Sequence, residues 1–186
     1  MNLFEYLAAA YTLILSFAVA RIIGGLPASI VPSSRYWVHL VFVAATFSAI
    51  ATTFWNFWSF RAADWTFARF LLALVQPALL HFIAATLIPS SPDQVESWRE
   101  YYYSIRRRYF VAIIAFGFVV AVNVILIIDL PLLHRSMGGV AWTIAAGAVG
   151  VSSDNPRVHA GLALIALVVM AIAVFVLFAQ PSGLVP

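Results

Sequence analysis

The sequence predicts an all-α polytopic bundle of about six transmembrane helices, and three observations support this fold class. Of the 186 residues, 64% are hydrophobic and 9% are charged, whereas soluble proteins carry roughly 25% charged residues. The mean hydropathy is +1.00. Apolar segments also recur at about the 20-residue length that a helix needs to cross a bilayer. We therefore expect one integral-membrane domain whose main partner is the lipid bilayer.

Short polar or Gly- and Pro-containing segments separate the predicted spans. We place these spans near residues 3–24, 36–59, 65–88, 107–129, 135–151 and 157–179. The first span has no basic segment before it, so it is predicted to be a retained helix and not a signal peptide. The fifth span is short and rich in Gly, which leaves a re-entrant segment as an alternative to a full crossing.

The linker 89–106 is the longest polar segment of the chain. Ser91, Pro92 and Asp93 are typical of a helix start. Beyond them, Trp98, Tyr102 and neighbouring aromatic residues recur at helical spacing, which indicates one apolar face. The linker is predicted to form an amphipathic helix at the inner membrane surface that runs into the fourth span.

Aromatic residues crowd the turn between the second and third spans. Eight of the positions in 54–70 are Phe or Trp. Trp in particular favours the membrane interface. Arg61, Asp64 and Arg69 lie among them as a charged turn at the outer face. Because Arg61 and Asp64 are three residues apart, we expect them to pair across the turn.

The distribution of Arg predicts the orientation. Seven Arg residues fall on one side of the predicted spans, at positions 21, 35, 99, 106, 107, 108 and 157, and three on the other, at positions 61, 69 and 135. The positive-inside rule then puts both termini in the periplasm and the linker inside. Arg106, Arg107 and Arg108 are predicted to anchor the fourth span to inner-leaflet lipid. The use of Arg without Lys, together with abundant Ala, suggests a GC-rich bacterial genome, and the predicted location is the bacterial inner membrane.

Several polar side chains are candidates for a pathway through the membrane. Arg21, His39 and His81 are expected in the inner third of the bilayer, where the two imidazoles could relay protons, bind haem or a metal, or form unrelated interfacial contacts. The other candidates are uncharged amides within the spans and one carboxylate at the outer end: Asn56, Gln76, Asn123 and Asp129. The Gln76-Pro77 dipeptide predicts a break in the third helix, either a structural kink or a gate hinge.

Small residues form a stripe along the fifth span. Gly139, Thr143 and Gly147 repeat every four residues, so another helix can approach this face closely. The neighbouring helix could belong to the same chain or to a second copy. A homo-oligomer is therefore left open.

Motifs for catalysis and for metal or nucleotide binding are absent from the sequence. Without Cys there is no thiolate site, and no hydrolase elbow, zinc pair or phosphate-binding loop is present. We expect no enzyme activity, no cofactor, no metal site and no nucleic-acid partner. Leu26-Pro27 recurs as Leu130-Pro131 at an offset of 104 residues, which indicates either chance or an old inverted duplication of the kind found in transporters.

The chain resembles a group of small bacterial multi-span membrane proteins of no known activity. The resemblance rests on Arg35-Tyr-Trp-Val-His-Leu40, Phe54-Trp-Asn-Phe-Trp58, Trp65-Thr-Phe-Ala-Arg-Phe70 and Arg106-Arg-Arg-Tyr-Phe110. It implies the fold but no activity or site. The leading functional hypothesis is movement of an ion, proton or small solute. The alternatives are a non-catalytic subunit or sensor that binds a partner protein and, third, a haem-binding electron-transfer protein.

Overall fold

The computed structural model describes residues 3–131 and 136–179. The helices are α1 (Leu3–Ser29), α2 (Trp37–Asn56), α3 (Phe67–Leu87), α4 (Trp98–Leu126), α5 (Ser136–Ser152) and α6 (Pro156–Ala179), with 3-10 helices η1 (Phe57–Ala62) and η2 (Pro92–Gln94). No strand occurs within these ranges. The all-α bundle predicted from composition is confirmed, and its six helices follow the order of the predicted spans.

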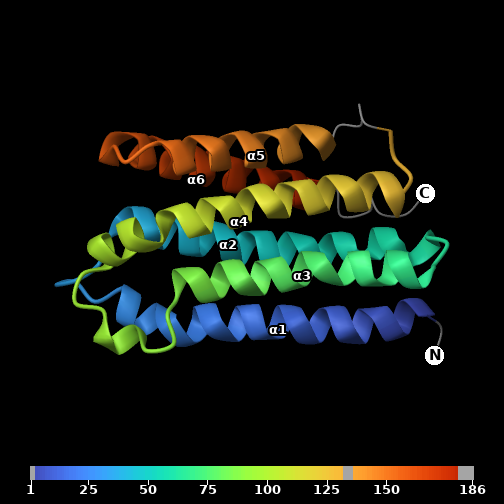
Figure 1. The fold of residues 1–186 in the computed structure, drawn as a ribbon, viewed down its shortest axis with the longest axis horizontal. Coiled ribbons are helices and arrows are strands. Elements are labelled where there is room, and N and C mark those ends of the chain that lie inside the picture. Colours follow the sequence, from blue (N-terminus) through green and yellow to red (C-terminus); the bar gives the residue numbers. More distant parts are fainter. Residues whose placement is uncertain (1–2, 132–135, 180–186) are drawn as a thin grey trace.

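Five of the helical segments are long and apolar enough to cross a membrane, the length and composition of a multi-pass membrane protein. The exception is α5, whose 17 residues cover about 25 Å at 1.5 Å per residue. This helix is continuous and runs along α4 toward the opposite end of the bundle (Figure 1). The described part of α5 therefore has no internal reversal of the kind that a re-entrant segment requires.

Local capping interactions explain where several helices begin. The Thr66 side chain accepts a hydrogen bond from the Arg69 backbone N–H at the start of α3. Ser97 does the same for Glu100 at the start of α4. At α6, Asn155 Oδ1 accepts from the Arg157 N–H at 3.0 Å, and Pro156 occupies the first helical position, where its missing N–H costs nothing.

The first helix is longer than predicted, because α1 continues through Gly24, Gly25 and Pro27 to Ser29. A Cβ atom built on Gly25 would lie 2.0 Å from Ile88 Cγ2. Glycine at this position thus permits close packing of α1 against the end of α3 and does not mark a turn. Pro27 lies inside α1 whereas Pro131 follows α4, so the two halves of the suspected duplication differ at their shared dipeptide.

The predicted linker helix begins later than expected, because Pro92–Gln94 form only the short η2 and the α-helix starts at Trp98 as the first turns of α4. Trp98 and Tyr102 on its apolar face have no exposed surface. The Trp98 indole N–H donates to the Ala28 carbonyl at 3.0 Å, and the Tyr101 hydroxyl donates to the Thr86 carbonyl at 2.9 Å. The aromatic face was predicted correctly, but it packs on the ends of α1 and α3 and not on lipid.

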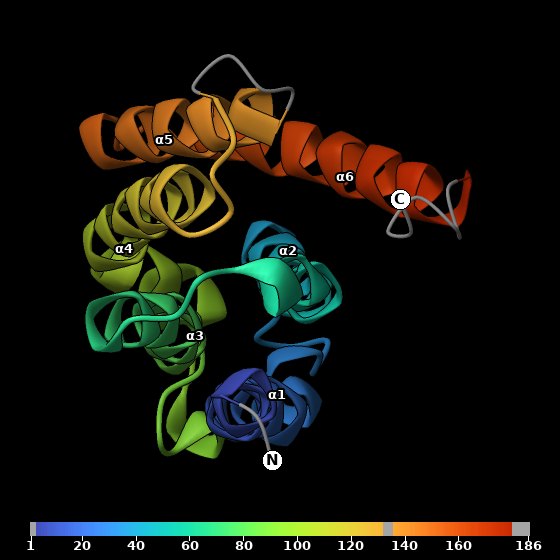
Figure 2. The same ribbon diagram turned by 90° about the vertical axis from the view of Figure 1, so that its right-hand side faces the viewer.

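The helices pack in pairs around the middle of the bundle. Viewed from one end, α1 lies at one edge, α3 and α2 lie next to it, and α4, α5 and α6 follow (Figure 2). Packing is most extensive between α4 and α5, between α1 and α3, and between α3 and α4, whereas α6 packs on α2 and barely touches α5. We call the end that holds residues 88–97 the linker end and the end that holds η1 the turn end. The start of α1 and the end of α6 both lie at the turn end (Figure 1).

Candidate functional site

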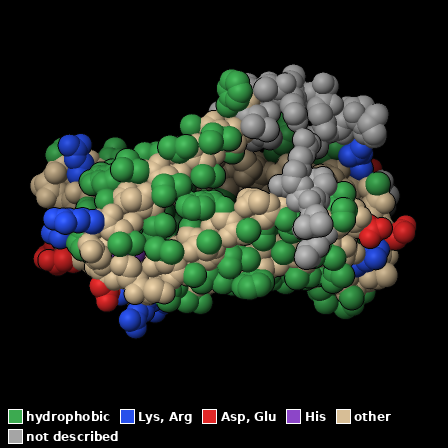
Figure 3. Space-filling view, turned by 90° about the horizontal axis from the view of Figure 1, so that it is seen from above, with side chains coloured by type: hydrophobic (Ala, Val, Ile, Leu, Met, Phe, Trp, Pro, Cys, Tyr) green, Lys and Arg blue, Asp and Glu red, His purple; other side chains and the backbone are tan. Residues whose placement is uncertain are grey.

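A cavity of about 800 Å³ lies within the bundle. Its wall is formed chiefly by α2, α3, α4, α5 and α6, because α5 stays against α4 while α6 stays against α2. The side of the molecule that carries α5 and α6 is hollowed between these helices (Figure 3). Among the residues that the structure describes, no charged side chain contributes to the cavity wall. We call this space the central cavity.

One face of α2 supplies three polar residues to the wall of the central cavity. Thr46, Ala49, Thr53 and Asn56 all line it, and their spacing of three or four residues places them on the same face of a helix. Thr46 and Thr53 are buried, while Asn56 is exposed at the end of α2. Of these residues only Asn56 was a candidate from sequence. The repeat of small polar residues at helical spacing was the pattern that could have identified the others.

Two hydroxyl groups on the cavity wall already donate their protons to backbone carbonyls. Thr52 Oγ1 lies 2.9 Å from the Ser48 carbonyl oxygen, and Thr143 Oγ1 lies 2.8 Å from that of Gly139. A hydroxyl has one proton and two lone pairs. Thr52 and Thr143 are consequently able to offer the central cavity only acceptor oxygens.

Gln76 and Asn123 form a buried amide pair on the wall of the same cavity. Asn123 Nδ2 donates to Gln76 Oε1 at 2.8 Å, and both residues line the cavity. Asn123 is 1% exposed and Gln76 is 9% exposed. Sequence analysis named both amides as candidates for a pathway, and the structure joins them across α3 and α4. The third helix continues through Pro77 without ending.

Aromatic side chains close the central cavity toward the linker end. Phe42 stacks on Tyr102 at a centroid distance of 5.8 Å and meets the edge of Phe110 at 5.4 Å. The Tyr102 hydroxyl donates to His159 Nδ1 at 2.8 Å, and His159 Nε2 donates to the Ser153 carbonyl at 2.8 Å. The carbonyl can only accept, which assigns the ring proton to Nε2. His159 was missed from sequence, because a single His in a first helical turn has no distinguishing spacing.

Arg106 joins α4 to the end of α5. Its guanidinium donates to the carbonyl oxygens of Gly150 at 3.4 Å, Val151 at 3.3 Å and Ser153 at 2.9 Å and forms an ion pair with Asp154. Carbonyls at a helix C-terminus lack intrahelical donors, so a cation is favourable there. Arg106 is 6% exposed. The prediction that it anchors lipid is wrong, whereas Arg107 and Arg108 are exposed and remain predicted anchors.

No protein-family model, curated protein or solved structure matches the chain. The resemblance to small bacterial membrane proteins therefore stays an expectation. Within the described ranges, no group of three or more His, Asp or Glu residues could hold a metal ion. The function is therefore inferred from the chemistry of the central cavity.

His39 and His81 have different neighbours and do not form a pair. The fully buried His39 ring stacks on Trp98 at 4.7 Å, and its Nε2 donates to the Leu87 carbonyl at 3.0 Å. His81 instead meets the edge of Phe17 on α1. Because Leu87, the partner of His39, is six residues beyond His81, the two imidazoles lie about 9 Å apart along the axis of α3. Arg21 is half-buried on α1, and none of Arg21, His39 and His81 lines the central cavity.

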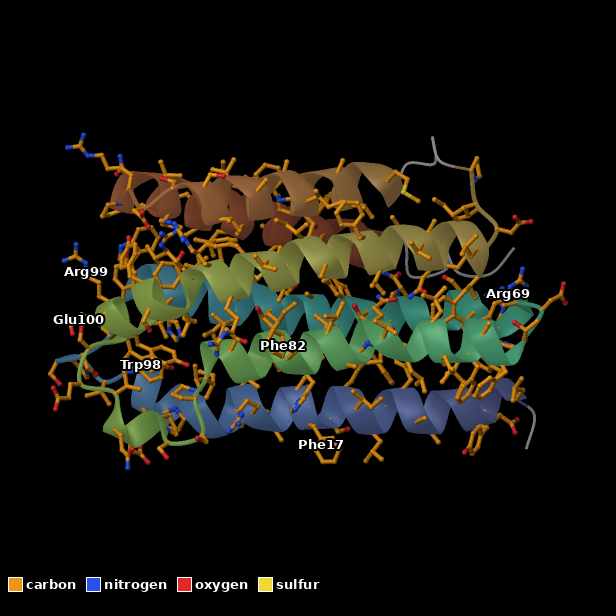
Figure 4. All side chains as sticks on the ribbon, viewed as in Figure 1. Phe17, Arg69, Phe82, Trp98, Arg99 and Glu100 are labelled. Atoms are coloured by element: carbon orange, nitrogen blue, oxygen red, sulfur yellow. The ribbon has the colours of Figure 1, made fainter. Side chains whose placement is uncertain are left out.

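The charged turn has contacts other than the predicted Arg61–Asp64 pair. The Arg61 guanidinium carbon lies 5.4 Å from the Trp58 ring centroid, and Arg61 Nη1 donates to the Trp58 carbonyl at 3.3 Å. Arg69 Nη1 donates to the backbone carbonyl of Asp64 at 2.7 Å. Arg61 therefore stacks on an aromatic ring. These charges lie at the turn end, as the separation of Arg69 from the linker-end residues Arg99 and Glu100 illustrates (Figure 4).

The remaining candidates lie near the turn end or along α5. Asp129 is exposed just beyond α4, with a left-handed φ of 59°, and is outside the wall of the central cavity. A Cβ on Gly147 would lie 2.5 Å from Ile114 Cγ1 of α4, whereas nothing lies within 4 Å of one on Gly139. The stripe therefore packs within the chain at Gly147, and a homo-oligomer remains a prediction. His134 and Arg135 lie outside the described residues.

A pair of tyrosine hydroxyls joins the loop before α2 to α4 at the linker end. Tyr36 and Tyr103 place their hydroxyl oxygens 3.3 Å apart. Burial, followed by this hydrogen bond, raises the pKa of the Tyr36 phenol above its ordinary value. The two hydroxyls form a hydrogen bond between the loop before α2 and α4.

Proposed function

We propose that this integral membrane protein binds a small, uncharged and partly apolar solute in the central cavity and moves it across the membrane. The observation that carries the proposal is a cavity of about 800 Å³ whose described wall has no charged side chain. Cavities that bind small molecules typically measure about 300–1,000 Å³ and combine apolar walls with a few polar groups. The central cavity has this size and this composition.

The chemistry of the wall favours an uncharged solute over an ion or a proton. A charged species in an apolar site loses its hydration and needs a countercharge, and the candidate ionisable residues Arg21, His39, His81 and Asp129 are not on the wall. An uncharged solute loses only hydrogen bonds with water. The Gln76–Asn123 amides and the α2 hydroxyls are able to replace these.

The two ends of the central cavity differ in a way that supports movement and not storage. The wall reaches Asn56 and Ser59 at the turn end, while Phe42, Tyr102 and Phe110 pack together at the linker end. Transporters alternate between states that expose one site to either side of the membrane. We infer that the arrangement represents one such state, with the linker end closed.

Flux into proteoliposomes tests the proposal. We expect uptake of phenyl β-glucoside or phenyl β-xyloside above that of protein-free liposomes, with no matching flux of protons or K⁺. Ala166 lines the cavity, whereas the adjacent Ile165 is 44% exposed on the outer face of α6. Ala166→Trp should abolish uptake, and Ile165→Trp should leave it unchanged. Proton or K⁺ flux, or no uptake of any of these solutes, would contradict the proposal.

A non-catalytic subunit that binds a partner protein is the second candidate. It is favoured by α6, which contacts α2 but hardly α5 and exposes Val168, Ile172 and Phe175. A helix of the partner protein, packed between α5 and α6, would fill the cavity. In that case the cavity is a docking site and not a solute site, and the isolated chain would transport no solute. Haem binding is not proposed, since His39 Nε2 is bound to a backbone carbonyl and His81 lies elsewhere.

A further inference from the structure

The amide pair retains hydrogen-bonding groups that the described residues do not use. The bond between Asn123 Nδ2 and Gln76 Oε1 leaves the Gln76 NH₂ group without a partner in this part of the chain, and Asn123 Oδ1 is a buried acceptor that also has none there. If both amides were turned over, the bond would run the other way. One NH₂ group and one carbonyl oxygen would again be left. In the orientation of the structure the free NH₂ group belongs to Gln76 and the free carbonyl oxygen to Asn123, whereas Gln76 would present its carbonyl oxygen if both amides were turned over.

Gln76 is the member of the pair that a ligand can reach. It lines the central cavity and is 9% exposed, whereas Asn123 is 1% exposed and its Oδ1 is enclosed. Asn123 thus acts as a positioning residue that holds the Gln76 amide across the gap between α3 and α4. An unpaired amide buried in an apolar environment is unfavourable by a few kcal/mol, so occupation of the cavity by a matching polar group would be favourable.

Nearby hydroxyls add further hydrogen-bonding groups. Thr52 and Thr143 donate to their own helices and offer acceptor oxygens on α2 and α5, whereas the buried Thr46 hydroxyl has no hydrogen-bond partner among the described residues. A solute therefore meets donors at Gln76 and Thr46 and acceptor oxygens on the same wall. The rest of the wall is largely apolar, with residues such as Leu80, Val120 and Met170. This combination suits an uncharged molecule with an apolar body and one oxygen-bearing polar group.

Resting on the proposed function, we propose that the solute of the central cavity is an uncharged amphiphile with a carbonyl or hydroxyl oxygen, which accepts a hydrogen bond from the Gln76 amide held in place by Asn123. A hydroxyl group would in addition donate to an acceptor oxygen of the wall. A purely apolar molecule of the same shape would leave the amide unpaired and bind more weakly.

Three naphthalene probes of similar shape test this assignment: 2-naphthol, 2-acetonaphthone and 2-ethylnaphthalene. Their binding to protein in lipid nanodiscs is measured by equilibrium dialysis, and binding to nanodiscs with the Ala166→Trp variant is subtracted as nonspecific. We expect 2-naphthol and 2-acetonaphthone to bind about five-fold more tightly than 2-ethylnaphthalene, the ratio that one net hydrogen bond of about 1 kcal/mol produces.

A double variant separates recognition from folding. Gln76→Met with Asn123→Leu removes both amides together, so no polar group is left unpaired, and such paired replacements are often close to neutral for stability. It should bind 2-ethylnaphthalene as the wild type does and lose the preference for the oxygen-bearing probes. Ser16→Ala is the matched control, because the Ser16 hydroxyl also donates to its own helix but lies on α1, outside the wall of the central cavity, and it should keep the full preference.

The outcomes distinguish this inference from the proposed function. Equal binding of all three probes to the wild type, or a preference that survives in the double variant, would overturn the role of the amide pair and leave the cavity as an apolar binding site. No binding above the Ala166→Trp background by any probe would overturn the proposed function as well.

Discussion

Replacing Arg106 by Met should destabilise the protein far more than the same replacement at Arg107. Met keeps an apolar stem of similar length but removes every donor and the charge. Arg106 is buried and serves the end of α5, whereas Arg107 is exposed. The two variants therefore compare a structural cation with a predicted lipid anchor one residue away.

The magnitude follows from the contacts of the guanidinium. The bond to the Ser153 carbonyl is 2.9 Å long, and a hydrogen bond to a charged group contributes about 1.5–3 kcal/mol. The bonds to Gly150 and Val151 are 3.4 and 3.3 Å long and are weaker. Asp154 is 75% exposed, so the ion pair adds about 0–1 kcal/mol. We expect Arg106→Met to lower the free energy of unfolding by about 3 kcal/mol.

The assay is unfolding by SDS in dodecylmaltoside micelles, followed by circular dichroism. Arg107→Met is expected to change the free energy of unfolding by less than about 0.5 kcal/mol, and Asp154→Asn by less than about 1 kcal/mol. An equal effect of Arg106→Met and Arg107→Met would refute the structural role and restore the lipid-anchor interpretation. An Asp154→Asn loss as large as that of Arg106→Met would show that the ion pair and not the carbonyl contacts carries the stability.

Two further predictions concern packing and orientation. Gly147→Leu should disrupt the α4–α5 contact, because its Cβ would lie 2.5 Å from Ile114 Cγ1, and should lower the stability by about 1–3 kcal/mol. The control Gly138→Leu should fold normally, because nothing lies within 4 Å of a Cβ at that position. Equal thermal stabilities of the two variants in detergent would contradict this packing. The second prediction is that the linker end faces the cytoplasm. A Cys placed at Ser33 or Ser91 should then be protected from an impermeant thiol reagent in spheroplasts, while a Cys at Ala62 should react. The reverse labelling pattern would invert the predicted orientation.

The agreement between sequence and structure is closest where one property of the chain decides the outcome. Lipid offers no hydrogen bonds to a backbone, so long apolar segments have to form helices, and the order of the six helices follows from segment length and from the separators between them. The aromatic face of 98–109 was also readable, because helical spacing alone sets which side chains share a face. The surface on which this aromatic face packs could not be predicted, since lipid and the end of α1 are equally apolar.

The sequence by itself determined the class of protein, the number and order of the helices, and the presence of amides in unusual positions. Only the tertiary structure decided which of these groups meet. Gln76 and Asn123 are 47 residues apart and pair because α3 packs along α4. His39 and His81 are separated because they face different helices. The physical reason is that hydrogen bonds and cavities depend on how helices are rotated and paired in space, and an all-round apolar helix carries little pattern that specifies its rotation.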